Sequence, residues 1–496
     1  MKRTHKRKNL IAQIILSVIV SLVLGWYVVN IHSISSYKIN VILVLVVAAG
    51  MVGLYIFKKY IINKSPLFIV LMYLLIMSSF VGAIVSIDLG PFSLFPYRVL
   101  FLFIAGISII KIYLSKFSLT NDAFVKGILT FLLFWIVYAF ISLLWVKDLT
   151  SGIKDIVFLL FGIGIIFIVV AYLVREKHYI SFYYIWLLMA AFLLLIGLIN
   201  HFLQIHLPVS RIYTASAYQK TIPTAVFTNE NDYASFVTIS VFLCLAFMNH
   251  YRRLVSVLAG LGFIGISLYI IMVTSSRANL LAVMISFAFW YLIIADKKTK
   301  ISLLRLLVIA GPVVILIFFN RVLSILQKVI HEITSLNIGQ ASAEGGSVEI
   351  RVNLLKNVLV FLQETFGFGV GAGNAEYYMQ HFQVFNTYGD FNIHNWWAEI
   401  LVNYGLLIFT IYVLIYLCLI YKLYHVYKNA LTKNIKMISE GLFMGLITFA
   451  LASISPSSMM ALPYNWLLFA FVIGFINFYQ NYSHTKLEEN DVGFKK

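Results

Sequence analysis

The sequence predicts an all-α fold: a polytopic membrane bundle of about fourteen transmembrane helices, with one large extracytoplasmic loop that contains short helices. Three observations lead to this prediction. Of the 496 residues, 61% are hydrophobic and only 11% are charged, whereas about 25% of the residues in soluble domains are charged. Apolar runs of about 20 residues, the length at which a helix crosses a bilayer, recur along the chain. One polar interval, residues 321–395, is much longer than the other gaps between these runs.

Each apolar run is expected to be a helix, because backbone N–H and C=O groups inside lipid must be paired within the segment. The first run follows five lysines and arginines, as a signal peptide would. It is too long for one and has no small-residue cleavage pattern after it, so we expect it to stay in the protein. The predicted spans are 10–29, 39–57, 67–87, 95–114, 124–145, 156–174, 180–203, 233–248, 254–273, 279–295, 302–320, 397–421, 438–454 and 464–480.

Charge placement predicts the orientation. With the N-terminus in the cytoplasm, 26 of the 37 Lys and Arg residues fall on the cytoplasmic side, and 12 of the 19 Asp and Glu residues fall on the other side. This is the positive-inside bias of membrane proteins, and it accounts for the net charge of +18 without a nucleic-acid partner. We therefore expect a multi-pass protein of the cytoplasmic membrane, in contact with membrane lipids, with both termini cytoplasmic.

The spans and loops predict three parts. Residues 1–200 form N-terminal transmembrane helices, residues 201–425 form a core that includes loop 321–395, and residues 426–496 form C-terminal helices and a cytoplasmic tail. Within the loop, apolar residues at helical spacing predict an amphipathic helix over 322–333 on the membrane surface. A second helix is predicted over 347–365.

Two features argue against a bound cofactor or metal. The glycine run 367–373 lacks the preceding strand and following lysine of a nucleotide-binding loop, so a tight backbone turn is the better interpretation. Cys244 and Cys418 lie within apolar runs, and neither a disulfide framework nor a metal cluster can be built from them. We expect no metal site and no cofactor.

Three arginines stand in outer segments that are otherwise nearly neutral. Arg211 lies in loop 204–232, Arg277 in the short turn 274–278, and Arg351 in the long loop. A guanidinium keeps its charge and donates two parallel hydrogen bonds to phosphate oxygens, so three of them at one membrane surface suit a pyrophosphate. Contacts with lipid headgroups or ion pairs within the loops are the alternative for each arginine.

His394 is a candidate general base. It precedes Asn395 and two tryptophans at the point where the loop returns to the membrane, and the tryptophans fit the aromatic belt of the interface. Imidazole accepts protons near neutral pH, which is the property a general base needs. An interfacial histidine with no role is the alternative.

The polar run before span 233–248 also has two interpretations. Asn229, Glu230 and Asp232 can bind sugar hydroxyls or a cation, or they can cap the helix that follows. The residues alone do not separate these interpretations.

Four sequence pieces, in this order and with this topology, resemble the O-antigen ligase and polymerase family of membrane glycosyltransferases. They cover roughly residues 200–420 of the chain. The pieces are Phe-Thr-Asn-Glu-Asn-Asp-Tyr at 227–233, Thr-Ser-Ser-Arg-Ala at 274–278, Arg351 ahead of Gly-Phe-Gly-Val-Gly-Ala-Gly-Asn at 367–374, and His-Asn-Trp-Trp-Ala-Glu at 394–399 leading to Tyr-Gly-Leu at 404–406.

The resemblance implies an active site outside the cytoplasm. The donor and acceptor would be glycans carried on undecaprenyl pyrophosphate. His394 would deprotonate the acceptor hydroxyl, and Arg277, Arg211 and Arg351 would hold the pyrophosphate. Asn229, Asn231, Asn395 and Glu399 would bind the substrate. No metal or cofactor is implied, and a flippase and a chain-length regulator are implied partners.

The chain as a whole looks most like the Gram-positive polymerases of the teichuronic acid type. A polymerase joins lipid-linked repeat units, whereas a ligase moves a finished glycan to a lipid or protein acceptor. A polysaccharide transporter or flippase is a third candidate. It is disfavoured because the predicted spans are nearly free of charge, whereas transporters place ionisable residues near the bilayer midplane.

Overall fold

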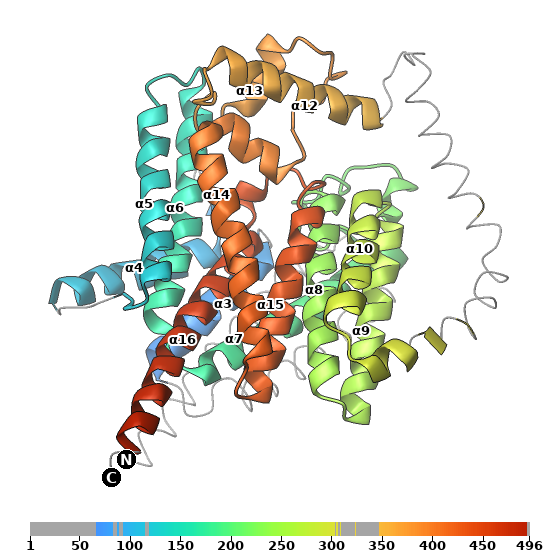
Figure 1. Cartoon of the computed structure of the whole chain (residues 1–496). Helices are drawn as coiled ribbons and strands as arrows, with labels where there is room; N and C mark the ends of the chain where they lie inside the picture. Colours follow the sequence, from blue (N-terminus) through green and yellow to red (C-terminus); the bar gives the residue numbers. More distant parts are fainter. Residues whose placement is uncertain are drawn as a thin grey trace.

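The computed structural model describes residues 66–82, 87–88, 93–114, 119–302 and 347–493, together with 304–305, 308 and 323. Long helices dominate this part of the chain (Figure 1). Residues 87–88 and 93–94 form a two-residue antiparallel pair, β1 and β2, with Ile87 opposite Leu94. The bundle helices are α3 (Leu67–Val81), α4 (Pro96–Leu114), α5 (Ala123–Ser142), α6 (Leu149–Tyr172), α7 (Glu176–Leu203), α8 (Glu230–His250), α9 (Leu254–Val273), α10 (Arg277–Ile293), α14 (Trp396–Lys428), α15 (Lys433–Ala452) and α16 (Pro463–Gly493). The loop elements are η3 (Gln219–Thr221), α12 (Ser347–Glu364), α13 (Ala375–Phe382) and η4 (Met459–Ala461).

The helical prediction is confirmed for most of the described chain, but span 67–87 is longer than the helix found there, since α3 ends at Val81 and Ile87 lies in β1. Eleven of the predicted spans coincide with helices, and seven described helices are long and apolar enough to cross a membrane. Spans 10–29 and 39–57, most of span 302–320 and the amphipathic helix predicted over 322–333 lie outside the described residues. Helix α12 confirms the helix predicted over 347–365.

Polar caps start several of these helices at the positions where the sequence changes from polar to apolar. Asp122 accepts a hydrogen bond from the N–H of Val125 at the start of α5, and Asp148 accepts one from Thr150 at the start of α6. Thr432 does the same for α15. Such caps satisfy backbone donors that have no partner inside the helix.

Close packing joins the helices at glycines and aromatic rings. Helices α8 and α15 pack against each other and are buried along most of their length. On α6, a Cβ atom added at Gly162 would come within 2.1 Å of the Trp466 ring, so α16 approaches as closely as it does only because the residue is glycine. Inside a bilayer such van der Waals contact takes the place of hydrophobic exclusion in holding helices together.

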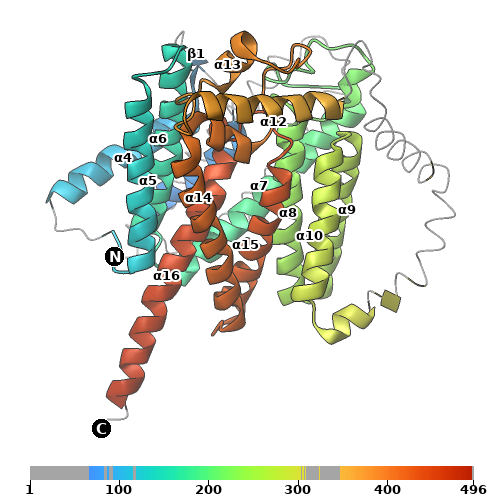
Figure 2. The same ribbon diagram turned by 45° about the horizontal axis from the view of Figure 1, so that its top comes forward.

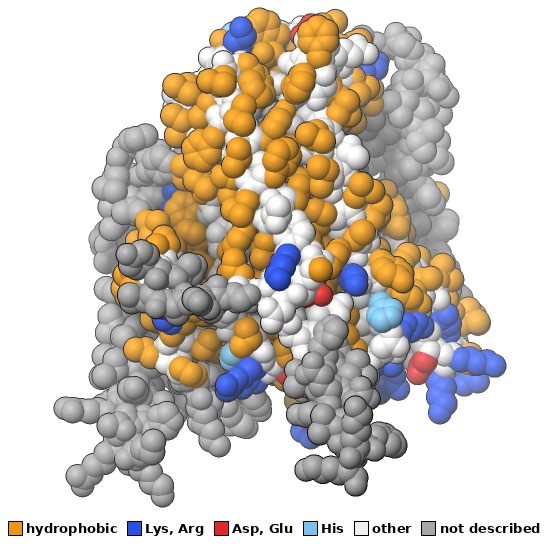
Figure 3. All heavy atoms as spheres, turned by 60° about the vertical axis from the view of Figure 1, so that its left-hand side comes forward, with side chains coloured by type: hydrophobic (Ala, Val, Ile, Leu, Met, Phe, Trp, Pro, Cys, Tyr) orange, Lys and Arg blue, Asp and Glu red, His pale blue; other side chains and the backbone are white. Residues whose placement is uncertain are grey.

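The two ends of the bundle differ. Helices α12 and α13 lie across one end, which also carries the α7–α8, α9–α10 and α15–α16 connections (Figures 1 and 2). We call it the loop end. On the flank seen in Figure 3, apolar side chains cover the middle of the bundle, and most of the Lys and Arg side chains in view gather toward the opposite end.

Candidate active site at the loop end of the bundle

A short connection between α15 and α16 joins the predicted site residues. The part of it that makes these contacts is Ser455, Pro456 and Ser457, which we call the Ser-Pro-Ser segment. Ser455 donates to the Asn231 side chain of α8 at 3.0 Å and lies 3.3 Å from the hydroxyl of Ser276, which precedes α10. Ser457 binds the Asp232 carboxylate through its N–H at 2.8 Å and its hydroxyl at 3.0 Å.

His394 docks on the same segment. Its Nδ1 lies 3.2 Å from the carbonyl oxygen of Pro456. A carbonyl only accepts hydrogen bonds, so Nδ1 carries the proton and Nε2 is left to accept one. The backbone at His394 is in the left-handed region, with φ of 53°, and its N–H donates to the side chain of Asn392 at 3.0 Å. Such a conformation is uncommon outside glycine and is often found at functional sites.

Asp390 stands beside the free nitrogen of His394. One of its carboxylate oxygens lies 3.7 Å from Nε2, where a negative charge stabilises the imidazolium that forms when Nε2 gains a proton. Interaction with His394 holds the pKa of the Asp390 carboxyl below its ordinary value, and the charge of Arg351 on α12 contributes in the same direction. The structure therefore brings Arg351, Asp390 and His394 into one group.

Arg277 is the first residue of α10, and its side chain is exposed at the loop end. In the turn before it, the backbone of Ser275 is in the left-handed region, with φ of 57°. The Ser276 hydroxyl accepts a hydrogen bond from the Asn279 side chain at 2.9 Å. A helix N-terminus carries a partial positive charge and unpaired N–H groups, both of which favour anions. Arg277 thus adds a full positive charge to an end that already favours an anion.

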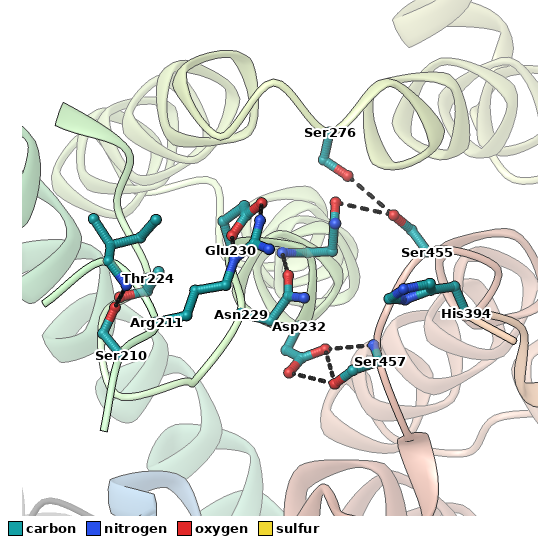
Figure 4. Close-up of polar contacts among 12 residues, drawn as sticks. Ser210, Arg211, Thr224, Asn229, Glu230, Asp232, Ser276, His394, Ser455 and Ser457 are labelled. Atoms are coloured by element: carbon teal, nitrogen blue, oxygen red, sulfur yellow. Dashed lines mark hydrogen bonds and ion pairs between the residues drawn. The ribbon is translucent and has the colours of Figure 1, made fainter. Parts of the chain in front are cut away.

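Arg211 forms the ion pair that the sequence left open as an alternative. Its guanidinium pairs with the Glu230 carboxylate through two hydrogen bonds, one of them 2.8 Å long from Nε. The Arg211 side chain is 54% exposed and that of Glu230 only 11% exposed. A guanidinium has five N–H donors, so the edge that Glu230 does not use still presents donors toward solvent. Figure 4 shows this pair on one side of the α8 N-terminus and His394 on the other.

The four predicted substrate-binding residues all make hydrogen bonds within the protein. Asn229 caps α8 by accepting from Asn231 at 2.7 Å, and Asn395 caps α14 by accepting from Trp397 at 3.0 Å. Asn231 is the acceptor for Ser455 described above. Glu399 accepts from Ser458 at 2.6 Å through one oxygen, and its other oxygen is buried with no hydrogen-bond partner among the described residues. Direct contact of these four side chains with a substrate stays a prediction.

The glycine run is a docking turn, which confirms the turn interpretation. Gly367, Gly369, Gly371 and Gly373 all have positive φ, between 62° and 95°. The run pairs with a break in α14 at Gly405, where φ is 75° and Leu406 donates to the Gly367 carbonyl at 2.8 Å. Only glycine fits at this break, because a Cβ atom on Gly405 would lie 2.3 Å from the Gly367 oxygen.

A substitution at this break is expected to destabilise the protein. Gly405→Ala places a side chain at a positive φ and against the Gly367 oxygen, so we expect the free energy of unfolding to fall by about 1–3 kcal/mol or more. Thermal unfolding of the detergent-solubilised protein measures it as a lowered Tm. Gly262→Ala is the matched control, since a Cβ atom there meets no other atom within 4 Å. Equal Tm values for the two variants would contradict the docking role of the turn.

The sequence does not predict two parts of this site, the Ser-Pro-Ser segment and Asp390. The Ser-Pro-Ser segment lies between spans 438–454 and 464–480, and its only signal is an unusual density of serines in a short turn. Asp390 lies four residues before His394, within a loop whose path no periodicity predicts. In the part of the chain that the structure describes, no cluster of three or more His, Cys, Asp or Glu residues could hold a metal ion.

Comparison with known proteins bears directly on this site. Residues 262–413, which contain Arg277, Arg351 and His394, match the family model described as O-Antigen ligase. The chain is also 35% identical over 418 residues to the Teichuronic acid biosynthesis protein TuaE of Bacillus subtilis (strain 168). That match covers 84% of this chain and 85% of the relative. The resemblance inferred from the four sequence pieces is thereby confirmed, and the chain belongs to the O-antigen ligase family of membrane proteins.

Proposed function

We propose that the protein is a polymerase that joins undecaprenyl-pyrophosphate-linked oligosaccharide repeat units of a cell-surface polysaccharide, such as teichuronic acid, on the outer face of the cytoplasmic membrane. Membership of the O-antigen ligase family and the likeness to a protein named for teichuronic acid biosynthesis both support a role in polysaccharide synthesis.

The observation that carries the proposal is the convergence at the loop end. The Ser-Pro-Ser segment links the start of α8, the turn before Arg277 and the imidazole of His394 through direct hydrogen bonds. The proposed base and the proposed pyrophosphate-binding arginine therefore lie at the same end of the bundle. A lipid pyrophosphate anchored in the bilayer would present its charged group and its glycan at the same level.

The reaction we propose is a single inverting glycosyl transfer. His394 Nε2 takes the proton of an acceptor hydroxyl, and the hydroxyl oxygen forms a bond to the anomeric carbon of the donor glycan. The bond from that carbon to the pyrophosphate oxygen breaks, and the electron pair leaves with undecaprenyl pyrophosphate. Arg277, Arg211 and Arg351 compensate the charge that develops on the leaving group, as preorganised cations do in other group transfers. The pyrophosphate is already a stable anion, so no second acid is needed to protonate it.

Charge supports the outer face as the location. Ten lysines and arginines lie in the connections at the end opposite to the loop end or in the helix turns beside them, and the positive-inside rule puts such a cation-rich end in the cytoplasm. They are Arg175, Lys177, Arg252, Arg253, Lys297, Lys298, Lys300, Lys428, Lys433 and Lys436.

A ligase is the second candidate, because the matching family model carries that name. Deletion of the gene, with the surface polysaccharide then separated by length, tests both. If the protein is a polymerase, the deletion strain should lose the ladder of chain lengths and keep only single repeat units on the carrier lipid. If it is a ligase, long chains should accumulate on the carrier lipid instead. An unchanged polysaccharide would contradict both.

The rate of transfer tests the pairing of Asp390 with His394. The carboxylate of Asp390 lies 3.7 Å from Nε2, and interaction with His394 lowers the pKa of Asp390, so this side chain is charged when Nε2 gains a proton. Asp390→Asn removes this charge. We expect kcat/KM to fall by up to about 5-fold, since a partly exposed pair contributes at most about 1 kcal/mol.

A matched control separates this effect from a general change of charge. Asp148→Asn removes a carboxylate at the same end of the bundle and leaves a residue that still caps α6. The value of kcat/KM should be unchanged in this variant. An equal fall in both variants, or no fall in either, would contradict the proposed pairing.

A further inference from the structure

A continuous chain of hydrogen bonds runs from a buried carboxylate on α8 to the ring of His394. Asp232 is 2% exposed and accepts a hydrogen bond from the N–H of Ser457 at 2.8 Å, and the Ser457 hydroxyl donates to its carboxylate from a position 3.0 Å from both oxygens. The preceding peptide carbonyl, that of Pro456, lies 3.2 Å from Nδ1 of His394. Figure 4 shows the contacts between Asp232 and Ser457, with His394 beside them.

We propose that Asp232 is a positioning residue for His394: by holding Ser457 it fixes the carbonyl of Pro456, which sets the tautomer and the orientation of the imidazole. This inference rests on the proposed function, since it assumes that His394 acts as a base. It assigns a role to residues on α8 and on the α15–α16 connection, both of which lie outside the matched range 262–413.

Asp232, which anchors Ser457, is itself rigidly held. Helix α8 is buried along most of its length, so Asp232 has a rigid support, and the hydroxyl of Tyr464 on α16 also donates to its backbone carbonyl at 3.3 Å. Proline at 456 restricts both its own φ and the conformation of the residue before it. With Ser457 fixed on one side and the proline ring on the other, the Pro456 carbonyl has little freedom to turn away from the imidazole.

The chemical consequence concerns which ring nitrogen is free. The Pro456 carbonyl can only accept, so it selects the tautomer with the proton on Nδ1 and leaves Nε2 facing Asp390. Without the anchor, the carbonyl can move, and the ring can take the other tautomer or rotate. Nε2 would then carry the proton or point elsewhere, and the base would be misplaced although His394 is still present.

Rate measurements on the full-length protein in lipid, with carrier-linked repeat units as substrate, test the inference. Asp232→Ala is expected to lower kcat by at least about 10-fold, with KM changed by less than about 2-fold, as for loss of a positioned base. Asp232→Asn should retain more activity, because an amide oxygen can still accept from Ser457. Ser453→Ala is the control: its hydroxyl is buried with no hydrogen-bond partner in the described chain, and kcat should be unchanged.

A second background shows whether Asp232 acts through His394. In the His394→Gly variant, free imidazole at high concentration serves as the base and needs no tether. We expect Asp232→Ala to leave the rate of His394→Gly unchanged, with imidazole or without it, because residues that act as a unit are not additive. A further loss of 10-fold or more in that background would overturn the inference, since Asp232 would then support something other than His394.

The two proposals fail in different ways. If the parent protein itself does not join carrier-linked repeat units, the proposed function fails. Full activity of His394→Gly without imidazole would refute the assignment of His394 as base. An impaired His394→Gly combined with a fully active Asp232→Ala would refute only the positioning role.

Discussion

Replacement of His394 by alanine is expected to abolish measurable polymer, with a fall in the transfer rate of about 10²–10⁴-fold, the usual contribution of a general base. The structure gives the reason. His394 Nδ1 is occupied by the Pro456 carbonyl, Nε2 faces Asp390, and the side chain is 19% exposed at the loop end. Within the described residues, no other imidazole is held by the Ser-Pro-Ser segment. Radiolabelled repeat units incorporated into chains by membranes of the variant provide the measurement.

The control for His394→Ala is His381→Ala. His381 lies on α13 at the same end of the bundle, and its Nδ1 bonds only to the Tyr377 carbonyl one helical turn earlier. Both variants should be present in the membrane at the level of the parent protein, and only His394→Ala should lose product. Chains of normal length and amount from His394→Ala would remove the general-base assignment.

Arg277→Lys is expected to lower the rate by about 10–100-fold, although the net charge is unchanged. Hydrogen bonds to charged groups are worth about 1.5–3 kcal/mol, and an ammonium cannot donate two parallel bonds to one phosphate as a guanidinium does. Arg277 occupies the first position of α10, at an end that itself favours anions. Rates measured over a range of carrier-linked substrate concentrations show whether binding or turnover is lost.

Arg252→Lys is the control for this substitution. Arg252 follows α8 at the opposite end of the bundle, is exposed and pairs with Asp296 at 3.7 Å. We expect no change in rate there, because exposed pairs of this kind contribute little. Full activity of Arg277→Lys would favour lipid-headgroup contact over pyrophosphate binding as the role of Arg277.

The helices were predictable from the sequence because apolar length and the need to pair the backbone in lipid determine them directly. The glycine run was also predictable as a turn, since alternate glycines have few other uses in such a loop. The number of fourteen transmembrane helices stays a prediction, because two predicted spans and most of a third lie outside the described residues and seven described helices meet the length and hydropathy of a span.

The composition of the site was only partly predictable. His394 and Arg277 stand in short sequence pieces that point to them, whereas Asp390 and the Ser-Pro-Ser segment gain their meaning from tertiary contacts. Asp232 illustrates the difference. Its position in the sequence favoured a helix cap or a substrate contact, but its carboxylate accepts hydrogen bonds from Ser457, which lies in a connection more than 200 residues later in the chain. No local sequence pattern predicts such a contact.

Reconstitution tests the central claim most directly. The purified protein in lipid vesicles is supplied with undecaprenyl-pyrophosphate-linked repeat units from outside, and chain length and released undecaprenyl pyrophosphate are measured together. We predict a ladder of lengths on the carrier, with one undecaprenyl pyrophosphate released for each bond formed, and neither product from His394→Ala. Chains that form equally well with His394→Ala, or carrier-linked repeats that cross the membrane and are never joined, would contradict the account.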